Sequence, residues 1–326
     1  MELVPLRAHG VGSRGTLPLP WWQFAWAAIA ALVLSFLALA VLWRRPVLIP
    51  RAEGGSISFN TRSITVLRWV ARAIGLALFG LTLGAALFGV DVAGESRNLA
   101  PVTIYVMMWV AVPILSVLLG DIWSALNPYR TIGLLFREGD ADDAPPHQWW
   151  AAGTIFGFLV LELVHPSGDS PRVLGWAMLV YSALMLGGLF RYGRIWLDRA
   201  DGFGVLFSLI AAMAPYNIDL DGRLRLRPPL SGLSRVTVLP GTMALILVTL
   251  GGTSFDGVSE SPIFTDIIGR PTGWAAAPPN LIWLVLMIGI ATVLYWICAS
   301  TTAQVTGISN YEAADLFSPA LIPIVW

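Results

Sequence analysis

Long apolar stretches separated by polar segments run through most of this chain. Seven stretches are long enough, or nearly so, to cross a hydrocarbon core: Trp21–Trp43, Ala73–Val92, Val102–Leu119, Trp149–Val164, Val173–Phe190, Val236–Leu250 and Leu281–Cys298. Such a core is roughly 30 Å thick. Each stretch should be helical, because a lone strand in lipid leaves its backbone amides unpaired. The pattern predicts an all-α polytopic membrane helix bundle, with residues 1–326 as one integral membrane domain.

Two apolar segments are too short to span. Gly202–Pro215 has 14 residues and is predicted to be an interfacial or re-entrant helix. Leu316–Trp326 has 11 residues and contains two prolines. We expect the latter to be a truncated eighth helix (316–326), although a tail lying at the membrane interface would also explain it.

The segment Asn217–Leu230 carries a different pattern. Ile218 and Leu220 alternate with polar residues before Asp221-Gly222, and Leu224 and Leu226 alternate after it. An Asp-Gly pair between alternating runs is typical of a β-hairpin. We therefore predict a hairpin on the same side of the membrane as the neighbouring arginines.

Arginine carries all the fixed positive charge, since the chain has no lysine. Of 20 arginines, six lie in 44–72, two in 120–148 and seven in 191–235, whereas the opposite side has five. Because cytoplasmic loops carry the excess of basic residues, the N-terminus is predicted to lie outside a bacterial cytoplasmic membrane. Residues 1–20 then form an outer leader and 252–280 an outer loop. Many tryptophans also lie near the segment ends, where membrane interfaces favour them.

Composition supports the membrane assignment and excludes other classes. The chain is 56% hydrophobic and 12% charged, with a formal net charge of zero. Soluble domains have about a quarter charged residues, and nucleic-acid binding would require a pooled basic patch. The single cysteine, Cys298, excludes an intramolecular disulfide and multi-cysteine metal sites. The expected partner is the lipid bilayer, with no nucleic acid.

A small set of ionisable residues is predicted to gather on the outer side. His9, Glu162, His165 and Asp256 would supply the nitrogen and carboxylate ligands that a divalent metal such as zinc accepts. Such a metal site could activate water, with Glu162 and Asp256 as the catalytic carboxylates. A structural interpretation competes with this one. In it, Glu162 pairs with Arg172, His165 only precedes Pro166 at a helix end, and His9 is solvated.

On the inner side, Asp121 and Arg130 are the candidate residues. Asp121 follows the third apolar stretch, and Arg130 ends the sequence Asn127-Pro128-Tyr129-Arg130. A carboxylate at a membrane boundary is suited to proton relay or to ligand binding. The structural alternative is an ion pair of Asp121 with Arg130 or with another loop arginine, beside an Asn-Pro turn.

Several catalytic signatures are absent from the sequence. The chain has no P-loop lysine, no Gly-x-Gly-x-x-Gly after a strand, no Gly-x-Ser-x-Gly and no His-Glu-x-x-His. Since each of these patterns supplies a phosphate cradle, a nucleophile or a zinc pair, their absence disfavours ATP-driven transport and standard serine hydrolysis.

Several short motifs resemble those of a known family. They are His9-Gly10-Val11-Gly12, Leu17-Pro18-Leu19-Pro20, Gly120-Asp121-Ile122-Trp123, Asn127-Pro128-Tyr129-Arg130, Leu161-Glu162-Leu163-Val164 and Ser254-Phe255-Asp256-Gly257. In these the chain is similar to bacterial polytopic membrane proteins known as fenitrothion hydrolases. The resemblance implies cleavage of an organophosphate triester, a small hydrophobic substrate, with release of a phenol at the outer face.

Two other functions stay open from the sequence. A small-solute transporter would explain the short Gly202–Pro215 segment, because interrupted helices often mark solute sites. It predicts a continuous polar path from Glu162 to Asp121. A non-catalytic subunit of a membrane complex is equally compatible with the pattern.

Overall fold

The computed structural model describes residues 56–58, 61–91, 98–136, 145, 147–218, 223–259, 261–269 and 271–325, together with four single positions between residues 26 and 34. The leader 1–20, with His9, lies outside the described residues. So does nearly all of the first predicted span, Trp21–Trp43.

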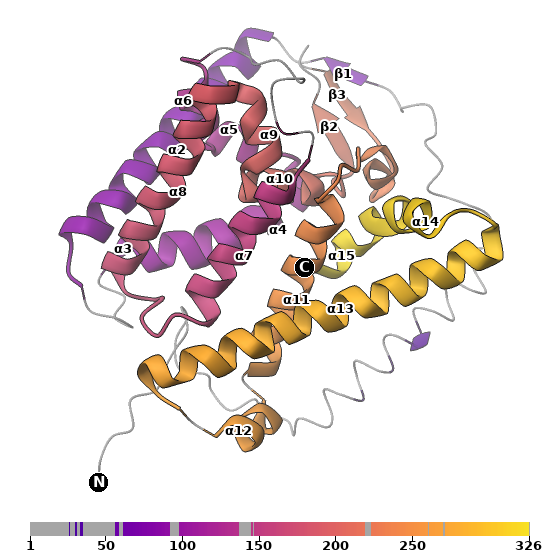
Figure 1. Ribbon diagram of the computed structural model, residues 1–326. Coiled ribbons are helices and arrows are strands. Elements are labelled where there is room, and N and C mark those ends of the chain that lie inside the picture. Colours follow the sequence, from indigo (N-terminus) through magenta and orange to yellow (C-terminus); the bar gives the residue numbers. More distant parts are fainter. Residues whose placement is uncertain are drawn as a thin grey trace.

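Long apolar helices dominate the described residues (Figure 1). The longer ones are α2 Thr61–Phe88, α7 Trp149–Leu163, α8 Pro171–Tyr192, α11 Thr242–Ser259 and α13 Ala277–Thr306. A further long segment runs from α3, Leu99–Pro101, through a π-helical stretch, Val102–Ala111, into α4, Val112–Leu119. These elements coincide with six of the seven apolar stretches in the sequence.

Five of these helical segments are long and apolar enough to cross a membrane: Arg62–Phe88, Leu99–Leu119, Pro171–Tyr192, Thr242–Ser259 and Gly273–Thr306. The chain is therefore a multi-pass membrane protein, as its composition predicts. Helix α7 has only 15 residues and is shorter than the roughly 20 residues that a membrane span needs. A total of seven or eight spans stays a prediction.

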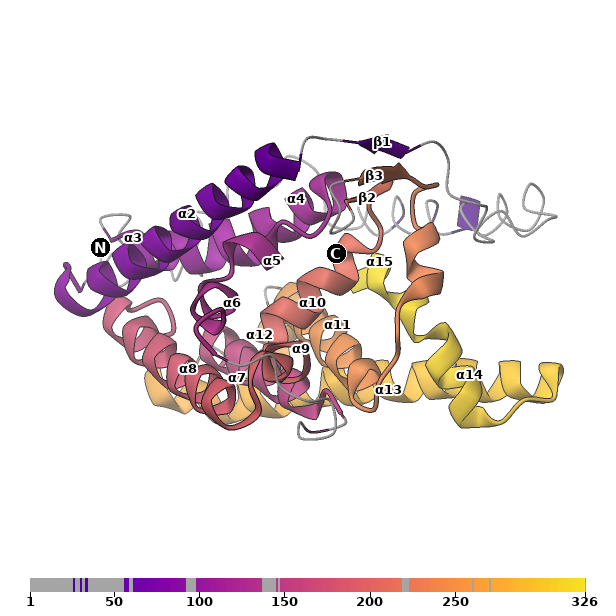
Figure 2. The same ribbon diagram turned by 90° about the horizontal axis from the view of Figure 1, so that it is seen from above.

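Short helices connect the long ones. They are α5 Trp123–Leu126, α6 Pro128–Gly133, α9 Leu197–Ala200, α10 Gly202–Ala211, α12 Pro262–Ile268, α14 Asn310–Phe317 and α15 Ile322–Val325. Viewed from above, α5, α6, α9 and α10 lie between the layer of α2 and α4 and the layer of α7, α8 and α13 (Figure 2).

Helix α10 lies inside the bundle. Nine of its ten residues are buried, and it packs against α4, α7 and α9. Of the two alternatives predicted for 202–215, the interfacial helix is therefore wrong, and the re-entrant helix stays a prediction. Hydropathy could not separate the two cases, because a helix wrapped in other helices is as apolar as one lying against lipid.

A small antiparallel sheet interrupts the helical fold. Strand β2, Tyr216–Ile218, pairs with β3, Arg223–Leu226, with Ile218 opposite Leu224. This pairing confirms the predicted hairpin. A third strand, β1 Ser56–Ser58, pairs with the other edge of β3 in the order β1-β3-β2. The predicted all-α class thus holds for the bundle but not for this sheet.

Three predicted loop or tail regions differ from the structure. Residues 61–72 of the predicted loop 44–72 belong to α2, so Arg62, Arg68 and Arg72 are helical. Residues 252–259 of the predicted outer loop belong to α11, so Asp256 is helical too. Residues 316–326 do not form one helix: α14 ends at Phe317, a 3-10 turn follows at Ser318–Leu321, and α15 comes next.

Two glycines allow close contacts that a side chain would prevent. A Cβ on Gly75 of α2 would lie 1.9 Å from the carbonyl oxygen of Leu126 in α5. A Cβ on Gly188 of α8 would lie 2.0 Å from Nε1 of Trp196. These contacts bring α2 against α5 and the Trp196 ring against α8.

Candidate functional site

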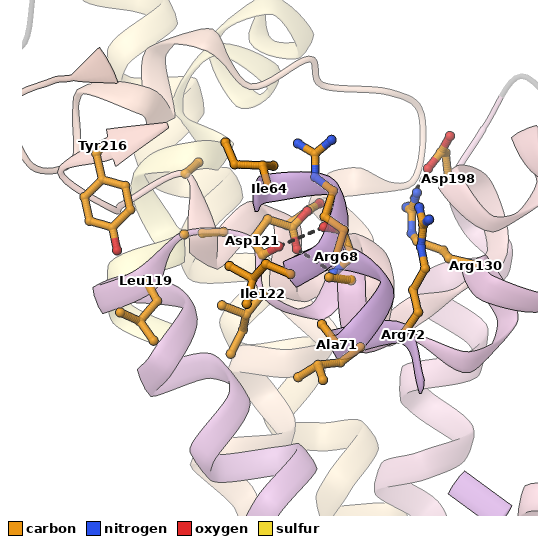
Figure 3. A pocket seen from close by; sticks show the side chains of 18 of the residues that line it. Ile64, Arg68, Ala71, Arg72, Leu119, Asp121, Ile122, Arg130, Asp198 and Tyr216 are labelled. Atoms are coloured by element: carbon orange, nitrogen blue, oxygen red, sulfur yellow. Dashed lines mark hydrogen bonds and ion pairs between the residues drawn. The ribbon is translucent and has the colours of Figure 1, made fainter. Parts of the chain in front are cut away.

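A large cavity opens at the end of the bundle where the arginines gather. It lies between the first turns of α2, the turn from α4 to α5, α6, the start of α9 and the segment that follows α10. Its volume is about 1560 Å³. Figure 3 shows Asp121 near its middle, Tyr216 on one side and the pair Arg130–Asp198 on the other. A space of this size would hold a drug-sized ligand.

Cationic side chains dominate the charge of this cavity. The arginines among its lining residues are Arg68, Arg72, Arg130, Arg194, Arg227 and Arg235. The acids among them are Asp121 and Asp198. Six positive against two negative charges leave an excess of four positive charges among the lining residues. The arrangement therefore favours an anion over a neutral or cationic ligand.

Asp121 is placed by the end of one helix and the start of another. Gly120, with φ of 71°, ends α4 in a conformation that suits glycine. Oδ1 of Asp121 then accepts a hydrogen bond of 3.1 Å from the amide of Ser124 in α5. Burial raises the pKa of the Asp121 carboxyl, and the Ser124 amide and Arg130 oppose that rise.

Arg130 pairs with Asp198 and not with Asp121. Its Nη2 donates to Oδ1 of Asp198 over 2.6 Å. Burial disfavours the charged form of Arg130, but Asp198 and Asp201 outweigh burial and raise its pKa. The Asp121–Arg130 ion pair considered from the sequence is therefore replaced by a pair that joins α6 to α9.

The predicted Asn-Pro turn is present at the start of α6. Oδ1 of Asn127 accepts hydrogen bonds from the amides of Tyr129 and Arg130, at 2.9 and 3.2 Å. Pro128 takes the first helical position, where its missing N–H costs nothing. This cap fixes the backbone from which Arg130 projects into the cavity.

Arg227 has a structural task at the cavity edge. Its Nε donates to the carbonyl of Ala214, and its Nη2 donates to the carbonyls of Ala211 and Ala212. These carbonyls lie at the end of α10 and just beyond it, where helix carbonyls lack internal partners. Arg72, by contrast, places its guanidinium 4.9 Å from the ring centre of Trp69 on its own helix.

The buried side chain of Asp201 joins three segments of the bundle. Asp201 is 1% exposed and Asn127 is fully buried. Asp201 accepts from Nδ2 of Asn127 at 2.5 Å, from the hydroxyl of Tyr181 at 2.6 Å and from the amide of Gly204 at 3.0 Å. These three bonds tie the α5–α6 turn, α8 and the start of α10 to one side chain.

Aromatic rings fill the interior beyond this network. Trp109 packs on Phe158, with ring centres 4.8 Å apart, and Phe158 packs on Phe203 at 5.1 Å. Phe203 contacts Phe207, which in turn meets Trp123 at 5.4 Å. These rings, here called the aromatic layer, belong to the main apolar core. The continuous polar path from Glu162 to Asp121 that a transporter would show stays a prediction.

The opposite end of the bundle holds the predicted outer residues. The hydroxyl of Tyr105, near the start of the Leu99–Leu119 segment, donates to the carbonyl of Gly168 over 2.7 Å. Glu162, in the last turn of α7, lies within electrostatic range of Asp256 on α11. The two predicted catalytic carboxylates are therefore neighbours, at the end remote from Asp121.

His165 lies outside the helix that carries Glu162. Helix α7 ends at Leu163, so His165 lies in the turn that follows it. Nδ1 of His165 accepts a hydrogen bond of 3.1 Å from the amide of Ser167, and its ring meets Trp274 edge-on. This ring nitrogen is engaged within its own turn, as the structural interpretation expects.

The predicted metal ligands do not form a set within the described residues. No group of three or more histidine, cysteine, aspartate or glutamate side chains there could hold a metal ion. Glu162, His165 and Asp256 are among the residues covered, and His9 lies outside them. Three of the four predicted donors thus do not fit a metal centre by themselves.

The alternative partner for Glu162 also differs from expectation. No ion pair between Glu162 and Arg172 occurs within the described residues. Instead, the amide of Arg172 and the hydroxyl of Ser170 donate to Oδ1 of Asp91, which follows α2. Asp91 therefore fixes the start of α8.

Sequence reasoning missed Asp198, Asp201 and the cavity arginines of α2. A signal was present for Asp201, since an aspartate directly before an apolar Gly-Phe-Gly run is a typical helix N-cap. Its side chain does accept from the amide of Gly204. The pairing of Asp198 with Arg130, 68 positions away, had no such local signal.

Comparisons with family models, with curated proteins and with solved structures find no match to this chain.

Proposed function

We propose that this multi-pass membrane protein binds an anionic ligand in the arginine-lined cavity. The observation that carries the proposal is the excess of four positive charges around a space of about 1560 Å³. Guanidinium groups suit phosphate and carboxylate because their planar forks donate two parallel hydrogen bonds. The proposal concerns binding at one face of the bundle and not passage through it.

The arginine distribution supports placing this cavity on the cytoplasmic side of the membrane. Its arginines come from 44–72, 120–148 and 191–235, the segments that hold the excess of basic residues. Under the positive-inside rule, the cavity would face the cytoplasm and the N-terminus would lie outside. The ligand would then be drawn from the cytoplasmic side of the membrane.

The first test changes the charge of the cavity in both directions. Replacing Arg68 and Arg72 together by glutamine should weaken binding of inorganic phosphate at least about tenfold, because each charged hydrogen bond contributes about 1.5–3 kcal/mol. Asp121→Asn should strengthen it, because it removes a repelling carboxylate. That gain should shrink as the pH falls, since the raised pKa of Asp121 means that the wild-type carboxyl is neutralised earlier than an ordinary aspartate.

Binding is measured by calorimetry on the purified chain in detergent. Arg62→Gln is the matched control, because Arg62 lies on the same helix but does not line the cavity. Equal phosphate affinity in the wild type, the double arginine variant and the Arg62 variant would contradict the proposed site.

We propose a hydrolase at the opposite end as a second candidate. The observation that favours it is the proximity of Glu162 and Asp256, together with the resemblance to fenitrothion hydrolases. A carboxylate there would take a proton from water while the water oxygen bonds to phosphorus and the bond to the aryl oxygen breaks; the phenolate that leaves then takes up that proton and becomes a phenol. No step through a metal is proposed, because the described donors do not form a metal site.

This candidate predicts that the purified protein releases nitrophenol from a nitrophenyl phosphotriester. Glu162→Gln and Asp256→Asn should each lower the rate at least about 100-fold, the lower range for loss of a general base. Asp266→Asn, an exposed change on the nearby helix α12, should leave the rate unchanged. Turnover retained in both carboxylate variants would exclude this hydrolase.

A further inference from the structure

The cavity lining is amphipathic. Beside its arginines, half of the residues that line it are alanine, isoleucine, leucine or valine. A fully hydrated anion such as free phosphate gains nothing from apolar walls, whereas a ligand with a charged head and a hydrocarbon tail gains from both parts of such a lining.

The apolar part of the lining continues onto the outer surface of the bundle. Leu67 of α2 lines the cavity and is 68% exposed, and Leu119 at the end of α4 lines it and is 52% exposed. Both helices belong to segments long and apolar enough to cross a membrane. An acyl chain lying along these two exposed leucines would reach from a bilayer around the bundle into the cavity without crossing water.

The charged part of the lining lies close to this opening. Arg68 and Arg72 stand two and three turns into the apolar helix α2, and both line the cavity (Figure 3). Charged residues at such depth normally face a polar cavity or the headgroup region, because lipid exposure is costly. Deeper along α2, Gly75 contacts Leu126 and brings α2 against α5, so the α2 residues in the lining all precede that contact.

We propose that the cavity holds an anionic phospholipid, with its phosphate on the arginines and an acyl chain along Leu67 and Leu119. This inference rests on the proposed anion binding and names the ligand class. Anionic headgroups are attracted to clustered arginines at a membrane face. A hydrocarbon tail adds about 0.8 kcal/mol for each buried CH₂ group.

The test compares three probes on the purified full chain in detergent, by native mass spectrometry and thermal stabilisation. Phosphatidylglycerol carries the charge and the chains, phosphatidylcholine carries the same chains without net charge, and glycerophosphoglycerol carries the charge without chains. Phosphatidylglycerol should bind at least tenfold more tightly than either of the others. The double change Arg68→Gln and Arg72→Gln should abolish the preference over phosphatidylcholine, and Leu119→Ser should weaken the lipid but not glycerophosphoglycerol.

The outcomes separate the two proposals. Equal binding of phosphatidylglycerol and glycerophosphoglycerol would overturn the lipid and leave the anion site standing. Equal binding of the two lipids in the wild type would overturn the headgroup contact. Failure of both charged probes and of inorganic phosphate would overturn the anion site as well. Arg62→Gln serves again as the control for charge outside the cavity.

Discussion

Asp201→Ala is expected to lower the free energy of unfolding by about 2–6 kcal/mol, because it leaves two buried side-chain donors unsatisfied at about 1–3 kcal/mol each. The carboxylate of Asp201 is 1% exposed and accepts three hydrogen bonds. Its removal would leave the amide of Asn127 and the hydroxyl of Tyr181 without an acceptor, and a buried unsatisfied donor costs about 1–3 kcal/mol. The loss should appear as a lower midpoint in denaturant unfolding of the purified protein.

Asp198→Ala is the matched control for that change. Asp198 lies three positions earlier, and its side chain is 51% exposed in its pair with Arg130. Exposed ion pairs contribute about 0–1 kcal/mol, so this variant should unfold close to the wild type. If Asp198→Ala proved as destabilising as Asp201→Ala, or if both were neutral, the buried network would not be the support described above.

Gly188→Ala is expected to destabilise the protein by about 1–3 kcal/mol, the usual range for overpacking. The new Cβ would lie 2.0 Å from Nε1 of Trp196, whose ring is almost fully buried and stacks on Tyr192. The indole cannot retreat without disturbing the turn between α8 and α9. Thermal unfolding monitored by tryptophan fluorescence would measure the change.

The preceding glycine provides the control for Gly188. A Cβ on Gly187 would meet nothing within 4 Å, so Gly187→Ala should be neutral or stabilising by up to about 1 kcal/mol through its better helix propensity. Both substitutions add one methyl group to the same helix. Equal melting temperatures for the two variants would show that the Trp196 contact does not constrain α8.

The sequence predicted features that depend on local pattern. The apolar stretches gave the long helices because spanning a membrane requires about 20 apolar residues in one run. The Asp-Gly pair predicted the β2–β3 hairpin, and Asn127-Pro128 predicted the turn that caps α6. Each of these depends on neighbours within a few positions, which a single sequence displays.

A single sequence did not predict the contacts between segments that are far apart in the chain. Asn127 and Asp201 are 74 positions apart, and nothing in either segment indicates the other. Strand β1 has only three residues, and its partner β3 lies far along the chain, so no alternating run announces it. The same limit explains Arg130: Asp121 lies nine positions before it in the chain, but the turn after α8 brings Asp198 into the ion pair instead.

The burial of α10 makes its position depend on packing between helices and not on contact with lipid. With ten residues, α10 is too short to insert across a bilayer on its own, and nine of those residues have protein and not lipid around them. Its surroundings exist only after α4, α7 and α9 have come together. The place of α10 therefore depends on those three elements, and Asp201, which accepts a hydrogen bond from the amide of Gly204, caps its start.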